Sequence, residues 1–446
     1  MNVRNVIRDA VCTACGCLCD DIEVVVADAR VIEANEACDL GCEMFLRDYG
    51  NDWPPATIAG RAVTIDQAVD EAARILAAAR FPLVYGLSHA TSEAQRAAVA
   101  IGDWIGANID TATSAYHGVS GTSFAGVGEV TCTLGEVRHR GDLVIFWGSD
   151  PAESHPRHFE RYSLEAAGMF VPRGRADRTC VVVDVTRTRT AEIADSFLQI
   201  KPACDFEALW ILRALVQGID LDSNFVQRST GVSLASWQDL ARQMKAAHFG
   251  VLFFGDGLLK TRGRYVNADA LMALTRDLNI YTRFVCLPMR GRGNRAGADD
   301  VLLWTTGYPF GVNQARGYPR FGPGEYTAAE TLSRGEPDAA LVVGSELLAE
   351  LPHAARDHLA TIPAISLDAD GSSGLPSSRV AFRTAAAGLG GSGTMNRMDD
   401  VPLWLRSTVD SPLSTDAEIL SRIEARVKAL RGYGKSLPVK ERTRVV

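Results

Sequence analysis

Six of the ten cysteines of this chain lie in one short stretch near its start, CTACGCLCDDIEVVVADARVIEANEACDLGC, which runs from Cys12 to Cys42. Soft thiolates at this density are typical of a site for zinc or for an iron–sulfur cluster. Three of the six share one loop, and a fourth follows a predicted hairpin, so these four are the candidate metal ligands. They are Cys12, Cys15, Cys19 and Cys38. Cys17 and Cys42 are left as spare thiols.

A second candidate is a tyrosine–histidine pair in the long glycine-rich loop DTATSAYHGVSGTSFAGVGE at residues 110–129. Tyr116 and His117 offer an acid–base pair beside glycines that let a ligand approach closely. A lone histidine is more often a structural residue than a catalyst. From the residues alone, a structural role for His117 is therefore favoured.

A third group consists of arginines in the loop LPMRGRGNRAGADD, residues 287–300. Guanidinium groups bind carboxylates or phosphates through paired hydrogen bonds, so Arg290, Arg292 and Arg295 are candidate ligand-binding residues. The alternative is that they are solvated loop charges.

The elements that must position these residues follow from the periodicity of the apolar side chains. Two short strands around an Asp28–Ala29 turn predict a small β unit that carries the cysteines. Further along, buried strands are predicted at residues 143–147 and 250–254, and a helix at 206–217. Strand–helix alternation of this kind builds parallel sheets.

Two segments of the alternating region resemble each other. LVIFWGSDPAESHPRHFE from Leu143 and ALVVGSELLAELPHAARDHL from Ala340 both place Gly-Ser-acid after an apolar strand, followed by Pro, His and Arg. We interpret this as an internal duplication of a nucleotide-binding-like half, because phosphate and ribose groups bind where such strands end. Chance similarity between two strand turns is the alternative.

The predicted fold class is α/β, with a small Cys-rich β unit and two Rossmann-like parallel-sheet domains. The expected ranges are 1–60 for the Cys-rich unit, 61–245 for the first α/β domain, 246–400 for the second, and 401–446 for a C-terminal helix and tail.

Composition narrows the function classes. The 446 residues carry a net charge of −8, which argues against nucleic acid as a partner. No apolar run approaches the roughly 18 residues that span a bilayer, and no signal peptide is visible, so a cytoplasmic protein without a membrane partner is expected. Motifs for hydrolysis, such as HExxH or a nucleophile elbow, are not found.

Several of these motifs resemble one family. CTACGCLCDDIE with NEACDLG is similar to the N-terminal cluster segment of molybdopterin-guanine-dinucleotide oxidoreductases, and specifically to the B subunit of formylmethanofuran dehydrogenase. MRGRGN, followed by LLWTTGYPFGVNQARGYPRFGPGE and later GTMNRMDDVPLWLR, resembles that subunit as well. The resemblance covers nearly the whole chain and implies a molybdopterin oxidoreductase-like fold, here without the C-terminal barrel.

One position departs from the dehydrogenase pattern. There, a cysteine immediately before a His-Gly pair ligates molybdenum or tungsten, whereas this chain has Tyr116. A phenol is a harder ligand than a thiolate. The departure matches the B subunit of the formyltransferase/hydrolase complex of methylotrophs, which resembles the dehydrogenase but does no redox chemistry.

This second resemblance implies a non-redox scaffold with a degenerate site at Tyr116 and His117 and no molybdopterin. The complex would convert formyl-tetrahydromethanopterin to formate via formylmethylofuran. Its other members would be a formyltransferase subunit, an amidohydrolase-like subunit and a further small subunit. Arg290, Arg292 and Arg295 would suit the polyglutamate arm of methylofuran, and the cysteines would hold structural zinc or stay empty, with an inherited [4Fe-4S] cluster as the alternative.

Two other functions stay open. The chain could be an active molybdenum- or tungsten-dependent formylmethanofuran or formate dehydrogenase subunit that holds its metal through another residue, for which His117 is nearest. It could also be an electron relay or redox sensor built on the cysteine cluster alone.

Overall fold

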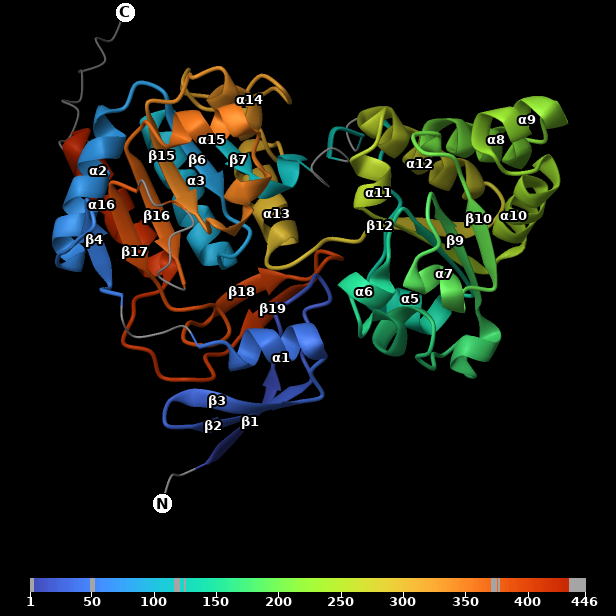
Figure 1. Ribbon diagram of the computed structural model, residues 1–446, viewed down its shortest axis with the longest axis horizontal. Helices are drawn as coiled ribbons and strands as arrows, with labels where there is room; N and C mark the ends of the chain where they lie inside the picture. The colour runs from blue at the N-terminus through green and yellow to red at the C-terminus, as the bar shows by residue number, and fades with distance from the viewer. Residues whose placement is uncertain are drawn as a thin grey trace, which may run out of the picture.

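The computed structural model describes residues 4–48, 53–115, 121–123, 126–369, 375 and 378–432. Tyr116 and His117 lie outside these residues. Two α/β lobes stand side by side, and a small antiparallel unit near the N-terminus lies below one of them and beside the other (Figure 1).

The N-terminal unit is a three-stranded antiparallel sheet, order β1-β2-β3, followed by helix α1. Asp28 and Ala29 connect β2 to β3 with φ of 51° and 58°. Positive φ at both central residues is what a tight hairpin turn requires, which confirms the predicted turn. The elements are β1 (Asn5–Ala10), β2 (Ile22–Ala27), β3 (Arg30–Asn35) and α1 (Asp39–Leu46).

One lobe, called the inserted lobe below, contains a five-stranded parallel sheet in the order β10-β9-β8-β11-β12. Its central strands are buried along their whole length, because helices cover both faces. The strands are β8 (Leu143–Trp147), β9 (Thr179–Asp184), β10 (Ser196–Gln199), β11 (Phe249–Phe254) and β12 (Arg283–Pro288). The helices are α5 (Leu134–Arg140), α6 (Pro151–Ser154), α7 (Arg189–Ile193), α8 (Asp205–Val216), α9 (Ser223–Thr230), α10 (Leu234–Ala246), α11 (Asp256–Leu259) and α12 (Arg264–Leu278).

The other lobe, called the split lobe, takes its elements from both sides of the inserted lobe in the sequence. Its nine-stranded sheet has the order β14-β13-β7-β6-β15-β16-β17-β4-β5, and the strands from β7 to β17 in this order run parallel. The strands are β4 (Ala56–Ile58), β5 (Arg61–Ala62), β6 (Pro82–Gly86), β7 (Asn108–Thr111), β13 (Val312–Asn313), β14 (Arg320–Phe321), β15 (Ala339–Val343), β16 (Ala364–Asp368) and β17 (Val380–Arg383). The helices are α2 (Ile65–Ala78), α3 (Ser92–Ile105), α13 (Arg295–Thr306), α14 (Ala328–Ser333), α15 (His353–Leu359) and α16 (Asp416–Leu430). A ribbon of β18 (Gly393–Asn396) and β19 (Pro402–Leu405) lies between this lobe and the N-terminal unit (Figure 1).

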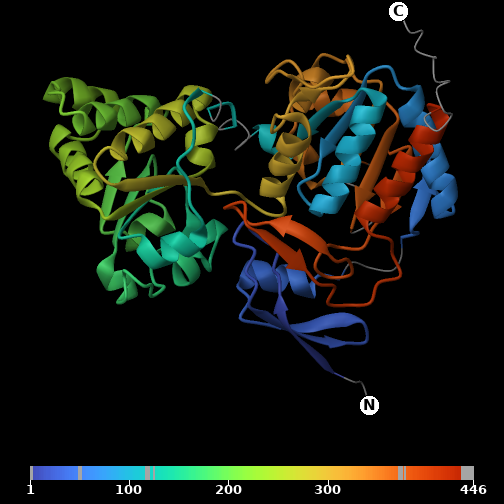
Figure 2. The ribbon, with the colours of Figure 1, turned by 180° about the vertical axis from the view of Figure 1, so that it is seen from behind.

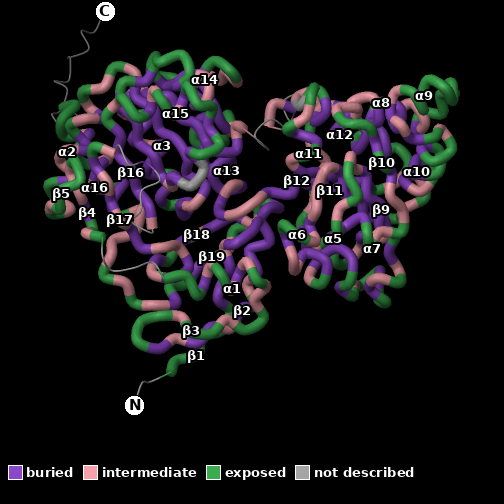
Figure 3. The backbone as a smooth tube through the Cα atoms, in the orientation of Figure 1, coloured by how far each residue is buried: buried purple, intermediate pink, exposed green. Residues whose placement is uncertain are grey.

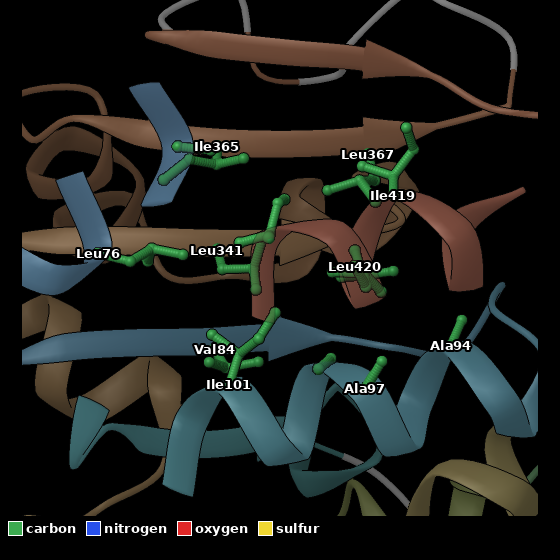
Figure 4. Packing of buried hydrophobic residues seen from close by; sticks show 14 of the residues in the cluster. Leu76, Val84, Ala94, Ala97, Ile101, Leu341, Ile365, Leu367, Ile419 and Leu420 are labelled. Carbon is green, nitrogen blue, oxygen red and sulfur yellow. The ribbon is translucent and has the colours of Figure 1, made fainter. Parts of the chain in front are cut away.

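Helices α2, α3 and α16 cover one face of the split lobe's sheet (Figure 2). Their apolar side chains meet those of β6 and β15, as Leu420, Ile101 and Leu341 show in Figure 4. Strand residues of both lobes are buried, while the outer helix faces are exposed (Figure 3). No helix in the described part of the chain combines the length and the apolar character needed to cross a membrane.

The two similar sequence segments occupy matching places. Strand β8 is the middle strand of the inserted lobe's sheet, and β15 is the middle strand of the parallel part of the other sheet. After β8, Gly148 donates its N–H to the carbonyl of Val183 over 3.0 Å, and after β15, Gly344 donates to Leu367 over 2.9 Å. Both glycines have positive φ, 56° and 78°. The structure therefore shows the same strand turn in both lobes.

The sheets do not follow the domain ranges expected from the sequence. The expected boundary after residue 245 falls between β10 and β11, which belong to one sheet. Strands β6 and β7 fall in the range expected for the first α/β domain, but they belong to the sheet that holds β15 to β17. Strand–helix alternation predicts that strands exist, but which sheet a strand joins depends on contacts between distant residues.

Candidate functional site

The three early cysteines lie in the loop between β1 and β2, and Cys38 caps the start of α1. The Cys12 N–H donates to the carbonyl of Cys19 over 2.8 Å, which closes the loop on itself. A Cβ on Gly41 of α1 would lie 3.2 Å from the Cys12 Sγ and 3.9 Å from the Cys38 Sγ. Two candidate ligands therefore turn their sulfurs to one point, which only a glycine leaves open.

The two remaining thiols of the stretch have other surroundings. The Cys42 Sγ lies 3.8 Å from the carbonyl oxygens of both Ala34 and Ala37. Cys17 is fully buried and donates a hydrogen bond to Cys15. These contacts support the choice of four ligands, which stays a prediction.

Burial dominates the electrostatics of these thiols. It raises the pKa of Cys12 far above its ordinary value and that of Cys19 to about 12. At Cys15 the hydrogen bond from Cys17 lowers the pKa to about 6, and the charge of His155 acts in the same direction. Burying several thiolates together is costly without a cation, and a bound metal supplies that charge.

The described side chains do not form a ready-made site for a single metal ion. Zinc needs four sulfurs at about 2.3 Å from one point. Within the described ranges, no three His, Cys, Asp or Glu side chains converge in this way. In a [4Fe-4S] cluster each cysteine binds a different iron, so the sulfurs lie farther apart. The sequence slightly favours zinc or an empty reduced site, with an inherited [4Fe-4S] cluster as the alternative, and the kind of metal stays a prediction.

The cysteine loop is packed against both lobes. Gly293, at the start of the split lobe's helix α13, donates its N–H to the Thr13 carbonyl over 3.2 Å. On the other side, Arg157 of the inserted lobe donates to both carboxylate oxygens of Asp21 at 2.8 Å. A cofactor held by the cysteines would thus lie where the two lobes meet.

The three candidate arginines do not converge on one ligand. Arg290 is buried, 6% exposed, and its Nη1 donates to Asp299 over 2.6 Å. Arg292 lines a surface hollow with Cys42 and Glu43 on α1. Arg295 begins α13 and is partly buried. Arg290 is therefore not a solvated loop charge. Its guanidinium also does not have all of its N–H groups available to a ligand, because Nη1 is paired with Asp299.

Asp299 is a site residue that the sequence did not single out. Its Oδ1 accepts from Thr111 over 3.0 Å and from Thr113 over 2.5 Å, while its Oδ2 binds Arg290. It therefore connects the arginine loop to the segment that leads into residues 116 and 117. Asp299 lies on the buried face of α13, next to Ala298. Because a buried carboxylate must be paired, this position could have indicated that Asp299 has a charged or hydrogen-bonding partner.

A crevice opens at the carboxyl ends of β6, β15 and β16, and Thr13, His89, Gly293, Gly344 and Asp368 are among the residues that line it. Asp368 ends β16, and its Oδ1 accepts from the Ser345 N–H over 2.7 Å. In the inserted lobe, Asp184 ends β9 in the matching place and accepts from the Thr186 N–H over 3.1 Å. Open parallel sheets bind nucleotides at such strand ends.

These features define the class of the protein. A small antiparallel sheet that carries the cysteines, joined to two lobes with parallel sheets, is an α/β fold that resembles molybdopterin oxidoreductase-like structures. The predicted fold class is confirmed.

The chain belongs to the family of formylmethanofuran dehydrogenase B subunits. It is 40% identical over 434 residues to the B subunit of the tungsten-containing formylmethanofuran dehydrogenase 2 of Methanocaldococcus jannaschii, covering 95% of this chain and 99% of that one. No protein-family model matches the sequence.

The formyltransferase/hydrolase complex is a more distant relative. Its B subunit from Methylorubrum extorquens is 29% identical over 298 residues, 65% of this chain and 74% of that one. The crystal structure of that complex with methylofuran contains a chain with a TM-score of 0.70 and 26% identity, covering 84% of this chain and 99% of that one. The comparisons thus favour a dehydrogenase B subunit over the formyltransferase/hydrolase subunit that Tyr116 predicts from the sequence.

Proposed function

We propose that this chain is the redox-active B subunit of a formylmethanofuran dehydrogenase-type complex. In this proposal Cys12, Cys15, Cys19 and Cys38 hold a [4Fe-4S] cluster, and the crevice at the strand ends holds the pterin dinucleotide of tungsten or molybdenum. The observation that carries it is the position of the cysteine loop. Through the Gly293–Thr13 hydrogen bond, that loop borders the crevice directly.

The roles of the chain's own residues follow from their chemistry. Asp368 and Asp184 place carboxylates at matching strand ends, where they can accept hydrogen bonds from ribose or base groups. Arg290 pairs its Nη1 with Asp299, and its buried Nε has no hydrogen-bond partner within the described ranges, so that N–H is the one at which a carboxylate such as formate would be held. When bound, the cluster and the pterin-held metal supply electron transfer and oxidation of the one-carbon group.

A second candidate function is favoured by one observation, the tyrosine at position 116. In it the chain is a scaffold of a formyltransferase/hydrolase complex, binds the methylofuran arm, and does no redox chemistry. Both candidates make the chain one member of a larger complex.

Metal analysis of the purified complex, combined with dye reduction by formate or by the formylated furan cofactor, separates the two candidates. The dehydrogenase predicts about four iron atoms per copy of this chain, stoichiometric tungsten or molybdenum, and dye reduction. Formate release from the formylated cofactor without dye reduction, in a complex that lacks both heavy metals after growth with them, would overturn it and support the scaffold.

A further inference from the structure

A second cavity borders Arg290, and its lining residues are not those of the crevice at the strand ends. This cavity has a volume of about 130 Å³ and lies between the end of β12, helix α13 and the turn between β18 and β19. Its wall carries four carboxyl groups and one guanidinium: Glu129, Asp299, Asp300, Asp400 and Arg290.

The carboxyl groups differ in their partners. Asp299 binds Arg290, and the Asp300 Oδ2 accepts from the Asn396 Nδ2 over 2.6 Å. The Glu129 Oε1 is buried and, among the described residues, has no hydrogen-bond partner. The Nε of the buried Arg290 also has none within the described ranges. An unpaired acid and an unpaired N–H on one cavity wall indicate that the cavity receives a polar ligand.

Four carboxylates facing a single guanidinium cannot all be charged at low cost. A metal ion would offset the excess charge, but no three of these acids, as described, come close enough to share one. Protonation of some of these carboxyl groups is then the way to reduce the excess negative charge. Burial raises the pKa of Glu129 to about 8, opposed by the charge of Arg290 and reinforced by that of Asp400. Burial also raises the pKa of Asp300 to about 6.

The cavity also reaches the surface. Asp400 is exposed, whereas Asp300 and Glu129 lie deeper beside Arg290. Burial raises the pKa of the Cys286 thiol on β12 well above its ordinary value, and the charge of Glu129 acts in the same direction. Three acids thus share the cavity wall with the guanidinium at which we place the substrate.

We propose that Glu129 exchanges the proton of the reaction with a substrate held at Arg290, and that Asp300 and Asp400 pass this proton to solvent. This inference rests on the proposed function. When formate becomes carbon dioxide, its C–H bond breaks, the proton goes to Glu129 in its deprotonated form, and the two electrons leave to two equivalents of an external one-electron acceptor, such as a low-potential iron–sulfur protein. The reverse reaction takes the proton and the electrons back.

Glu129→Gln removes the proton site and keeps the shape, and Glu129→Asp keeps the acid. Glu165→Gln is the matched control, because Glu165 is exposed and lies on the inserted lobe away from the cavity. Infrared spectra of the purified complex between about pH 6 and 9 would show a protonated carboxyl band that is lost with an apparent pKa of about 8, above the pKa of about 6 of Asp300. The band should be absent in Glu129→Gln and unchanged in Glu165→Gln. A wild-type band that survives in Glu129→Gln would overturn the proposal.

The kinetic experiment follows formate-dependent dye reduction against pH. We expect Glu129→Gln to lower the rate by about 10²-fold or more and to flatten the pH profile, with partial recovery in Glu129→Asp and unchanged metal content. An unaltered rate and profile would overturn the role of Glu129 while leaving the proposed function intact. A wild-type complex that is metal-replete and reduces no dye would overturn both, whatever the infrared band shows.

Discussion

At the scale of single residues, Asp299 holds together parts of the site that lie far apart in the sequence. One carboxylate binds the buried Arg290 and two threonines, Thr111 at the end of β7 and Thr113 just after it. Because Arg290 is buried, removing its counter-charge leaves an uncompensated cation. We expect Asp299→Asn to lower the free energy of unfolding by about 3–5 kcal/mol, measured by urea denaturation.

The matched control is Asp239→Asn. Asp239 pairs with Arg242 on an exposed helix face, where an ion pair contributes about 0–1 kcal/mol. Equal losses in the two variants would show that the Arg290 pair is not desolvated in solution.

The cysteines allow a comparison within one loop and one helix. Cys38→Ser removes a predicted ligand, whereas Cys42→Ser, one helical turn later, removes a thiol that faces the carbonyls of Ala34 and Ala37. We expect Cys38→Ser to lose bound iron and the visible absorption of the cluster, and Cys42→Ser to keep both. If both variants stayed iron-loaded, the assignment of Cys38 as a ligand would be wrong.

The pH dependence of stability tests Glu129 without any cofactor. Its pKa of about 8 lies above the value of about 4.3 for an unfolded glutamate. The folded state therefore binds more protons between these values, and stability falls as pH rises through this window. Gln does not titrate. We expect the stability of the wild type to fall relative to Glu129→Gln between about pH 5 and pH 8 in urea unfolding at each pH. A constant difference would contradict a protonated Glu129.

At the scale of elements, α16 completes the split lobe although it comes last in the described chain. Leu420 is fully buried against α2 and α3, whereas Leu430 at the helix end is 56% exposed. We expect Leu420→Ala to destabilise the protein by about 2–5 kcal/mol, and Leu430→Ala by well under 1 kcal/mol, in thermal or urea unfolding. A small effect of Leu420→Ala would mean that α16 is not docked in solution.

The elements also show what could be predicted from the sequence. The Asp28–Ala29 turn and the strands at 143 and 340 follow from local pattern, and the structure has them where expected. The roles of Asp299 and Glu129 do not follow, because each depends on contacts with Arg290, which no local pattern reveals. The cysteine ligands fall between these cases. Their spacing indicates a metal, but only the structure shows that the sulfurs of Cys12 and Cys38 both lie close to Gly41.

At the scale of the whole molecule, the chain leaves the split lobe, builds the inserted lobe, and returns. Its two crossings lie side by side, because the Cys286 N–H donates to the carbonyl of Val130 over 2.9 Å. A segment whose ends meet, and whose sheet is complete within it, has the geometry of an inserted domain. We therefore propose a division by sheets in place of the ranges 61–245 and 246–400.

This division predicts which fragments fold. A fragment of residues 130–289 holds all five strands of the inserted lobe's sheet and the core between that sheet and helices α8, α10 and α12. We expect it to unfold cooperatively on heating, with dispersed amide resonances, although less stably than in the full chain, since its contacts to the cysteine loop are lost. A fragment of residues 61–245 lacks β11, the partner of β8, and lacks β15, the partner of β6. It should stay unfolded or aggregate, because two buried strands would each present an open edge. Cooperative unfolding of the second fragment, with failure of the first, would restore the boundary after residue 245.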